Sequence, residues 1–532
     1  MRDALTPQPA RLGTRRALGR VRAGAWRPRL AARWANPWRL VLLLAFVQIA
    51  LWGVLSAHLI AAPQNDSLEQ VLLSQEFQLA YGKHPPLPTW LLYGVNQLFG
   101  ASIGATHLLG ALCSVATLLL LYTWARPLIG ASRAALATLL ASGVEFMSSG
   151  TTYFNHNTVQ LPFALLTIVL FHRALTRTRR VDWALLGAAA GLMLLVKFSA
   201  VVLFAAFALY LVWTRRLREP RTLRGLALAA LVCAAVVAPH FIAALDAPTA
   251  SGGYAAQSLY PDHLDRIQRL KSVWNFAISH AAKVAPALLI FIWLRRRAPP
   301  AAQRSEQADA LRPFLTIVGF APLLLTLGIA TLAGAFLLVG WGTTFHVLLT
   351  FWLVAASPWA VQAPRRVLLR AALACIALQV TTWSVLTANG GAFPNLNRMK
   401  PYLTALPPPE LAQAVQDAWA EHSGSKLHHV ISDVRTGAAL AVAFGGVPRV
   451  VDGHRGDFEA VLPSAVAHAC GSVTVASSAP VADPQSRHYA AWDARFAAPT
   501  VLSVVEFHHA GPGKFYIGVR APAPGAICPT GL

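Results

Sequence analysis

The sequence predicts an α-helical, multi-pass membrane protein with about eleven spans, interfacial helices and a small C-terminal α/β domain. Of its 532 residues, 55% are hydrophobic and only 13% are charged, whereas soluble domains carry about 25% charged residues. The net charge of +23 comes largely from short arginine clusters beside apolar runs, a distribution typical of membrane proteins. These observations exclude an ordinary soluble enzyme and a disordered chain, and they do not indicate a nucleic-acid partner.

The first element is a basic tail over residues 1–38, which carries eight arginines between Arg11 and Arg33. We expect this tail to be cytoplasmic and to touch anionic lipid. The Arg15-Arg16 pair does not indicate an export signal, because the apolar run begins only at residue 39 and is too long for one.

A transmembrane domain is predicted over residues 39–388. Its apolar segments are 39–62, 104–125, 134–150, 158–175, 183–197, 199–214, 223–246, 275–294, 314–334, 336–356 and 367–388. Arginine clusters follow every second segment, which places those ends in the cytoplasm. The sequence therefore predicts that the N-terminus is cytoplasmic, and that loop 63–103 and the C-terminal tail lie outside.

The outer loop over 63–103 contains two amphipathic helices, predicted over 67–79 and 88–99. Neither can span a membrane, and Trp90 and Tyr93 are suited to anchoring them at its interface.

Asp66 lies at the start of the first of these helices, with Glu69 on the same helical face. An aspartate there caps the helix or, beside a lipid-linked substrate, serves as a general base. Lys83 and His84 precede two prolines that stiffen the turn between the helices. These two side chains form a solvated turn or bind a phosphate group.

Residues 389–532 are predicted to form a periplasmic α/β domain, because strand and helix patterns alternate there. Helices are expected over 410–420 and 435–444, and strands at 428–432, 447–451, 472–476, 501–507 and 514–519. Cys470 and Cys528 both lie in this domain, on an oxidising side. A disulfide between them and two free thiols both remain open.

Several ordered segments carry a resemblance to a known family. An aspartate after the first span is followed by an interfacial helix, then HPPL, a tryptophan and LFG, within residues 61–100. This order resembles the GT-C glycosyltransferases of the protein O-mannosyltransferase and aminoarabinose-transferase superfamily. The nearest branch is the bacterial dolichyl-phosphate-mannose mannosyltransferase-like group. The resemblance continues through 107–141, 153–175 and 183–204, and it hardly covers the C-terminal domain.

The resemblance implies a polyprenyl-phosphate sugar as donor and transfer on the non-cytoplasmic face. Asp66 matches the family's catalytic acidic position, which activates the acceptor. Family members usually have Asp-Glu there, whereas this chain has Asp66-Ser67, so Glu69 is the candidate second carboxylate. Lys83 and His84 match a turn that lies near the donor phosphate in aminoarabinose transferases. The acidic residue of that turn is absent here, so no metal and no other cofactor are predicted.

Two asparagines and a lysine at the outer ends of spans complete this part of the predicted site. Asn155 and Asn157 are predicted to hydrogen-bond the sugar or the acceptor, with helix capping as the alternative. Lys197 interrupts an apolar stretch, which is costly unless the charge meets a partner, water or phosphate. It matches a recurrent family lysine and is assigned to the donor phosphate or to an ion pair, with snorkelling as the alternative.

Three further candidates for the donor phosphate follow later in the chain. Arg266 and Arg269 lie in an outer loop that contributes cationic residues in relatives, although a solvated amphipathic helix explains them equally well. His346 roughly matches a family tyrosine or histidine near the lipid phosphate, with a packed core histidine as the alternative.

The predicted function is therefore that of an inverting glycosyltransferase in the bacterial inner membrane. It moves a sugar from a polyprenyl-phosphate donor to an envelope acceptor (a lipid, glycan or protein) on the periplasmic face. One alternative is a transporter or lipid flippase, for which inverted repeats and charges near the midplane are typical. The other is a non-catalytic envelope scaffold.

Overall fold

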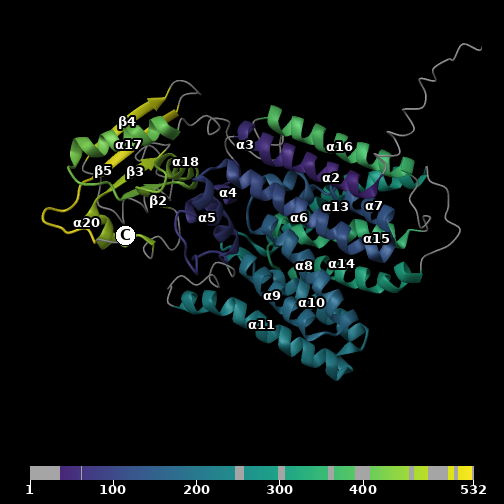
Figure 1. Ribbon diagram of the computed structural model, residues 1–532. Coiled ribbons are helices and arrows are strands. Elements are labelled where there is room, and N and C mark those ends of the chain that lie inside the picture. The colour runs from purple at the N-terminus through teal and green to yellow at the C-terminus, as the bar shows by residue number, and fades with distance from the viewer. Residues whose placement is uncertain are drawn as a thin grey trace, which may run out of the picture.

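The computed structural model contains a helical bundle and a smaller α/β domain attached at one end of it (Figure 1). The bundle comprises the helices up to α16, and the domain begins at α17. The structure describes residues 36–60, 63–245, 257–296, 306–357, 365–389, 408–453, 461–476, 501–507 and 513–529. The predicted basic tail lies outside these residues.

Eight helical segments in the described part of the chain are long and apolar enough to cross a membrane. The first combines α2 (Pro37–Gln48), η1 (Ile49–Leu55) and α3 (Ser56–Leu59), and the seventh combines η5 (Val339–His346) and α15 (Leu349–Ala356). The other six are α6 (Gly104–Ile129), α8 (His156–Arg177), α11 (Pro220–Leu245), α13 (Arg266–Arg296), α14 (Glu306–Ala333) and α16 (Arg365–Ala388).

The remaining three predicted spans are helices of 11 to 17 residues, and two of them, at 134–150 and 199–214, are shorter than expected. They are α7 (Ala131–Ala141), α9 (Arg180–Val196) and α10 (Ala200–Trp213). The 3₁₀ segments η2 (Glu145–Met147) and η3 (Ser149–Thr152) follow α7, and η4 (Arg216–Arg218) follows α10. The multi-pass helical fold is confirmed, whereas the number of eleven spans stays a prediction.

Close backbone contacts fix the elements that later carry the site. A Cβ atom on Gly110 of α6 would lie 2.0 Å from the carbonyl oxygen of Thr151, so η3 packs directly on α6. A Cβ atom on Gly187 of α9 would lie 2.3 Å from the carbonyl oxygen of Ala229 in α11. Only glycine permits these contacts, which hold the start of α8 and the end of α9 in place.

The outer loop contains α4 (Asn65–Leu73) and α5 (Leu87–Phe99), which lie between the bundle and the C-terminal domain (Figure 1). The prediction for α5 is confirmed to within one residue. The first helix ends six residues before its predicted end at residue 79, because Gln75 and Glu76 turn away and bond to the C-terminal domain. The apolar face of α4 packs on that domain and not on lipid, so its amphipathic pattern reflects a protein interface.

The C-terminal domain has a five-stranded sheet in the order β2-β1-β3-β5-β4. The strands are β1 (His429–Ser432), β2 (Arg449–Asp452), β3 (Ser472–Ala476), β4 (Val501–Phe507) and β5 (Gly513–Arg520). Strand β1 pairs in parallel with β2 and β3, with Val430 opposite both Val450 and Val473. The pairs β3/β5 and β5/β4 are antiparallel.

In the described part of this domain, the helices are α17 (Pro408–His422), α18 (Val434–Phe444) and α20 (Ser464–Cys470). The first two and all five strands confirm the predicted pattern, whereas α20 was not predicted. Cys470 and Cys528 form a disulfide, with 4.5 Å between their Cα atoms. The alternative of two free thiols is therefore wrong in this structure.

Candidate functional site

Asp66 is an exposed residue in the first turn of α4. The N-cap of this helix is Gln64, so Asp66 is not the capping residue. Its Oδ2 atom accepts a hydrogen bond from Nδ2 of Asn155 at 3.1 Å. The carboxylate is thus held by a neutral amide and remains accessible to a molecule approaching from the outer loop.

Asn155 joins this carboxylate to the N-terminus of α8. Its Oδ1 atom accepts hydrogen bonds from the backbone N–H groups of Asn157 at 2.9 Å and Thr158 at 3.1 Å. Its Nδ2 group is the one that donates to Asp66. The structure therefore shows the helix cap, whereas a hydrogen bond from Asn155 to the sugar or the acceptor stays a prediction.

Lys197 lies in the turn between α9 and α10 and meets the other asparagine. Its Nζ donates to Oδ1 of Asn157 at 2.5 Å, and it lies 5.9 Å from the ring centroid of Trp341. Burial lowers the pKa of this lysine, and the negative charge of Asp66 acts in the opposite direction. Asp66, Asn155, Asn157 and Lys197 thus form a continuous array, here called the polar chain, that draws on α4, α8 and the α9–α10 turn.

His84 and His156 form a pair of tilted rings, with 44° between their planes. Their ring centroids are 4.2 Å apart, and Nε2 of His156 lies 3.2 Å from the carbonyl oxygen of Pro85. Burial, followed by the charges of His156, Lys83 and Lys197, lowers the pKa of His84 well below its usual value. His84 would therefore meet a phosphate as a neutral hydrogen-bond donor and not as a cation.

Glu69 does not reach toward the amide of Asn155 but pairs with Lys83. The Nζ atom of Lys83 lies 3.0 Å and 3.2 Å from the two carboxylate oxygens of Glu69. The structure therefore brings two of the predicted residues together as an ion pair at the edge of the outer loop.

A second group of polar residues, here called the histidine cluster, surrounds Phe146. His280 Nδ1 lies 2.8 Å from His346 Nε2, and Lys283 pairs with Glu145. The centroid of the Phe146 ring lies 5.1 Å from that of His280 and 6.2 Å from that of His346, and 5.3 Å from Lys283 Nζ. His346 is a buried histidine, as its alternative predicted, but its partner is another polar side chain.

Tyr153 connects the two groups. Its pKa is raised first by burial and then by the negative charge of Glu145, and its hydroxyl interacts with the side chain of Gln64. Gln64 is the N-cap of α4, two residues before Asp66. The sequence analysis did not select Tyr153, His280 or Lys283. Lys283 could have been selected from the sequence, because a lysine within an apolar span needs a partner.

Arg266 and Arg269 lie in the first turn of α13. Arg269 donates to the carbonyl oxygens of Gly334 at 2.8 Å and Leu264 at 2.5 Å. Its guanidinium also lies 5.7 Å from the ring centroid of Tyr260. These contacts tie the start of α13 to the end of α14, whereas Arg266 is exposed. A role of either residue toward a phosphate stays a prediction.

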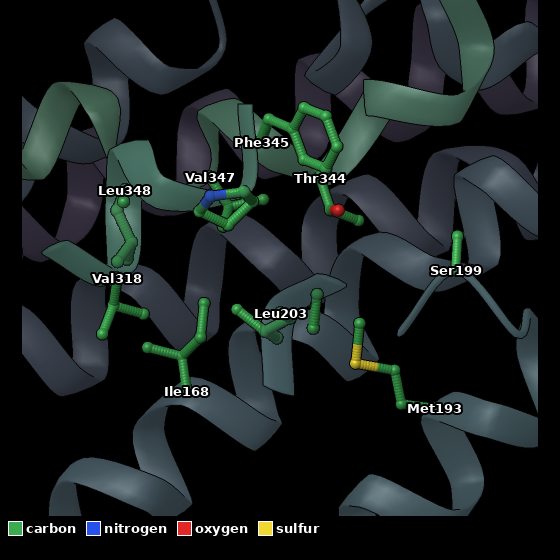
Figure 2. A pocket seen from close by; sticks show the side chains of 12 residues that line it. Ile168, Met193, Ser199, Leu203, Val318, Thr344, Phe345, Val347 and Leu348 are labelled. Carbon is green, nitrogen blue, oxygen red and sulfur yellow. The ribbon is translucent and has the colours of Figure 1, made fainter. Parts of the chain in front are cut away.

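A small cleft lined mostly by apolar residues lies within the bundle (Figure 2). The cavity volume is about 10 Å³, roughly the space of one water molecule. Its walls come from α8, α9, α10, α14 and η5, and Ile168, Met193, Leu203, Val318 and Leu348 line it (Figure 2).

Polar residues connect this cleft to both groups. Ser199 and Thr344 also line it, and they lie two residues from Lys197 and His346, respectively. The Oγ atom of Ser199 lies 3.4 Å from Nε2 of the buried Gln160.

Within the described parts of the chain, no three His, Cys, Asp or Glu side chains gather in a way that could hold a metal ion. The cofactor requirement therefore stays a prediction.

A family model described as "Dolichyl-phosphate-mannose-protein mannosyltransferase" matches residues 83–242. The matched segment contains Asn155, Asn157 and Lys197 of the polar chain. A search of curated proteins gave no match.

Among solved structures, ArnT from Cupriavidus metallidurans bound to undecaprenyl phosphate is similar, with a TM-score of 0.60 and 14% identity. The alignment covers 90% of this chain and 97% of that chain. The apo state of that protein has a TM-score of 0.46 at 15% identity, covering 92% and 98%. The apo oligosaccharyltransferase of Archaeoglobus fulgidus has a TM-score of 0.40 at 12% identity, covering 77% and 64%.

The similarity to the lipid-bound ArnT structure shows that this chain has the GT-C fold, as predicted. The two weaker matches, with TM-scores below 0.5, do not establish a common fold. The family match supports the resemblance found in the sequence.

Proposed function

We propose that the protein is an inverting membrane glycosyltransferase that moves a sugar from a polyprenyl-phosphate donor to an envelope acceptor. The observation that carries this proposal is the polar chain, in which an exposed carboxylate and an ammonium group are linked through two asparagines beside an apolar cleft. The GT-C fold and the family match support it. The structurally similar ArnT from Cupriavidus metallidurans binds undecaprenyl phosphate, which is a polyprenyl phosphate.

In the proposed reaction, an acceptor hydroxyl or amine attacks the anomeric carbon of the sugar. Asp66 takes the acceptor's proton as general base. The bond between the anomeric carbon and the phosphate oxygen breaks, and the polyprenyl phosphate leaves with the bonding electrons. Lys197 and Lys83 offset the charge of that phosphate. One displacement inverts the anomeric carbon.

The outer face of the bacterial inner membrane is the proposed location. Helix α8 begins at the polar chain and ends at Arg177, and α9 begins at Arg180 and returns to Lys197. The arginines Arg173, Arg177, Arg179 and Arg180 therefore lie at the end opposite the site. Because such clusters favour the cytoplasmic side, the site and the C-terminal domain are assigned to the periplasm.

The test is sugar transfer by the purified protein from a panel of polyprenyl-phosphate sugars, with crude envelope as acceptor. The expected result is release of polyprenyl phosphate by the wild type. We expect its loss in Asp66→Asn, a variant that still binds the lipid. Equal turnover in the two proteins would remove Asp66 from the mechanism. No turnover with any donor would contradict the proposal and favour a transporter or a scaffold.

A further inference from the structure

The C-terminal domain holds both ends of α4, the helix that carries Asp66. At its start, Arg435 Nε donates to Oδ1 of Asn65 at 2.5 Å, and Asn65 immediately precedes Asp66. Just beyond its end, Nε2 of Gln75 donates to the carbonyl oxygen of Val450 at 2.9 Å. The N–H group of Val450 donates back to Oε1 of Gln75 at 3.0 Å.

The contacts of Gln75 resemble strand pairing. Strand β2 is at the edge of the sheet, where backbone groups on the outer side have no neighbouring strand. The amide of Gln75 satisfies the N–H and C=O groups of Val450 together, as a neighbouring strand would. Beside it, Arg449 Nη2 lies 2.6 Å from Glu76 Oε2. Two adjacent residues after α4 are thus joined to two adjacent residues of β2.

The length of α4 is buried against the same domain. Its side chains Leu68, Val71 and Leu72 are at most 8% exposed and share one hydrophobic cluster with the sheet and α18. A Cβ atom on Gly437 of α18 would lie 3.5 Å from Cδ2 of Leu72. Other side chains of α4 bond to the membrane domain, through Asp66 with Asn155 and Gln70 Oε1 with Thr89 Oγ1 at 2.7 Å.

A helix of nine residues is too short to be stable by itself in water, so its position depends on tertiary contacts. We propose that the C-terminal domain positions Asp66 for catalysis by holding α4 through three attachments: Arg435–Asn65, Gln75–Val450 and Arg449–Glu76. This inference rests on the proposed role of Asp66 as the base. The attached residues are positioning residues, because they act through α4 and do not contact the reacting atoms.

The kinetic test uses one variant for each of the first two attachments and one for each partner of the Arg449–Glu76 pair. Gln75→Ala, Arg435→Ala, Glu76→Arg and Arg449→Glu should each lower kcat about tenfold and leave the donor KM unchanged, since misplacing a catalytic group by 1 Å costs about 10²-fold. The exchanged pair Glu76→Arg with Arg449→Glu should recover most of the kcat. Asp417→Ala is the matched control, because it removes a hydrogen bond with Gln413 inside α17 of the same domain. The control should keep the wild-type kcat.

Hydrogen exchange of the full-length protein provides a second readout that needs no substrate. Exchange in residues 63–76 should rise in Gln75→Ala and Arg435→Ala, while α8 stays protected. If exchange and kcat both stay at wild-type values, the inference is overturned. It is also overturned if the variants unfold at lower temperature but keep the wild-type kcat. Absence of transfer in the wild type would instead contradict the proposed function, and the exchange result would still decide whether the domain holds α4.

Discussion

Three carboxylates of the outer loop and the neighbouring helix ends are held in different ways. Asp66 accepts a hydrogen bond from the neutral amide of Asn155. The ammonium group of the polar chain, that of Lys197, bonds to Asn157 and not to Asp66. Glu69 is paired directly with Lys83, and Glu145 directly with Lys283. A general base has to take up a proton, and a carboxylate in a direct ion pair loses that pair when it does so.

The contrast shows how one structure separates two uses of the same functional group. In the polar chain, Lys197 interacts electrostatically with Asp66 but does not form an ion pair with it. In the histidine cluster, the ion pair neutralises the charge of Glu145 beside the aromatic ring of Phe146. The first arrangement suits proton transfer, and the second suits the fixing of neighbouring helices.

The largest expected effect comes from replacing each carboxylate by its amide. Asp66→Asn should lower kcat by about 10³-fold, within the usual range for loss of a general base. Glu145→Gln and Glu69→Gln should lower it by less than tenfold, because their carboxylates are not assigned to proton transfer. Initial rates with one polyprenyl-phosphate sugar, compared at equal amounts of folded protein, measure this order. A larger loss in Glu145→Gln would reverse the assignment.

The two lysines should differ in a similar way. Lys197→Met removes the cation of the polar chain and should raise the donor KM and lower kcat, together by about 10²-fold in kcat/KM, since it is assigned to the leaving phosphate. Lys283→Met leaves Glu145 without its cation and should lower the unfolding temperature while kcat/KM changes less than threefold. Scanning fluorimetry and transfer rates on both variants separate the two outcomes. Equal kinetic losses would place the histidine cluster in the active site.

Asn155 allows the cap and the site contact to be separated. Asn155→Ser retains a good N-cap residue but is too short to reach Asp66, so kcat should fall about tenfold with nearly unchanged stability. Asn155→Ala loses both functions and should also destabilise the protein by about 1 kcal/mol. Thermal unfolding and kcat are measured on the same preparations. If the serine variant keeps the wild-type kcat, Asn155 is only a cap.

The sequence predicted the parts of the fold that follow from local patterns. Apolar runs located the helices of the bundle, and short segments predicted as strands located all five strands of the C-terminal domain. It overestimated the helical length of some spans, because an apolar composition continues beyond the residues that are helical. The segment 134–150, for example, ends as a helix at Ala141 and continues through η2 and η3, where Thr151 packs on Gly110.

The site was predictable only where one residue carried an unusual signal. Lys197 stood out because a charge is expensive in an apolar segment, and Asp66 because it begins the outer-loop helix and matches the acidic position of the family that the sequence resembles. The structure joins both to the same chain of contacts. The pairing of Glu145 with Lys283, 138 residues apart, depends on how two helices pack. The attachment of Gln75 to Val450 spans 375 residues, and no local pattern indicates either partner.

The smallest expected effect concerns His84, whose low pKa distinguishes it from the cations of the site. Because burial keeps its ring neutral, the unfolded chain binds more protons than the folded one at pH values below about 6.5. This contribution to stability is fully present above that pH and is lost on acidification. The unfolding temperature of the wild type should therefore fall when the pH is lowered from 7 to 5. In His84→Gln the fall should be smaller, by on the order of one or two degrees. Near pH 6.5, the donor KM should depend on pH in the same way in the wild type and in His84→Gln. A step in the wild type alone would mean that His84 binds the donor as a cation, which would remove the distinction between it and Lys83.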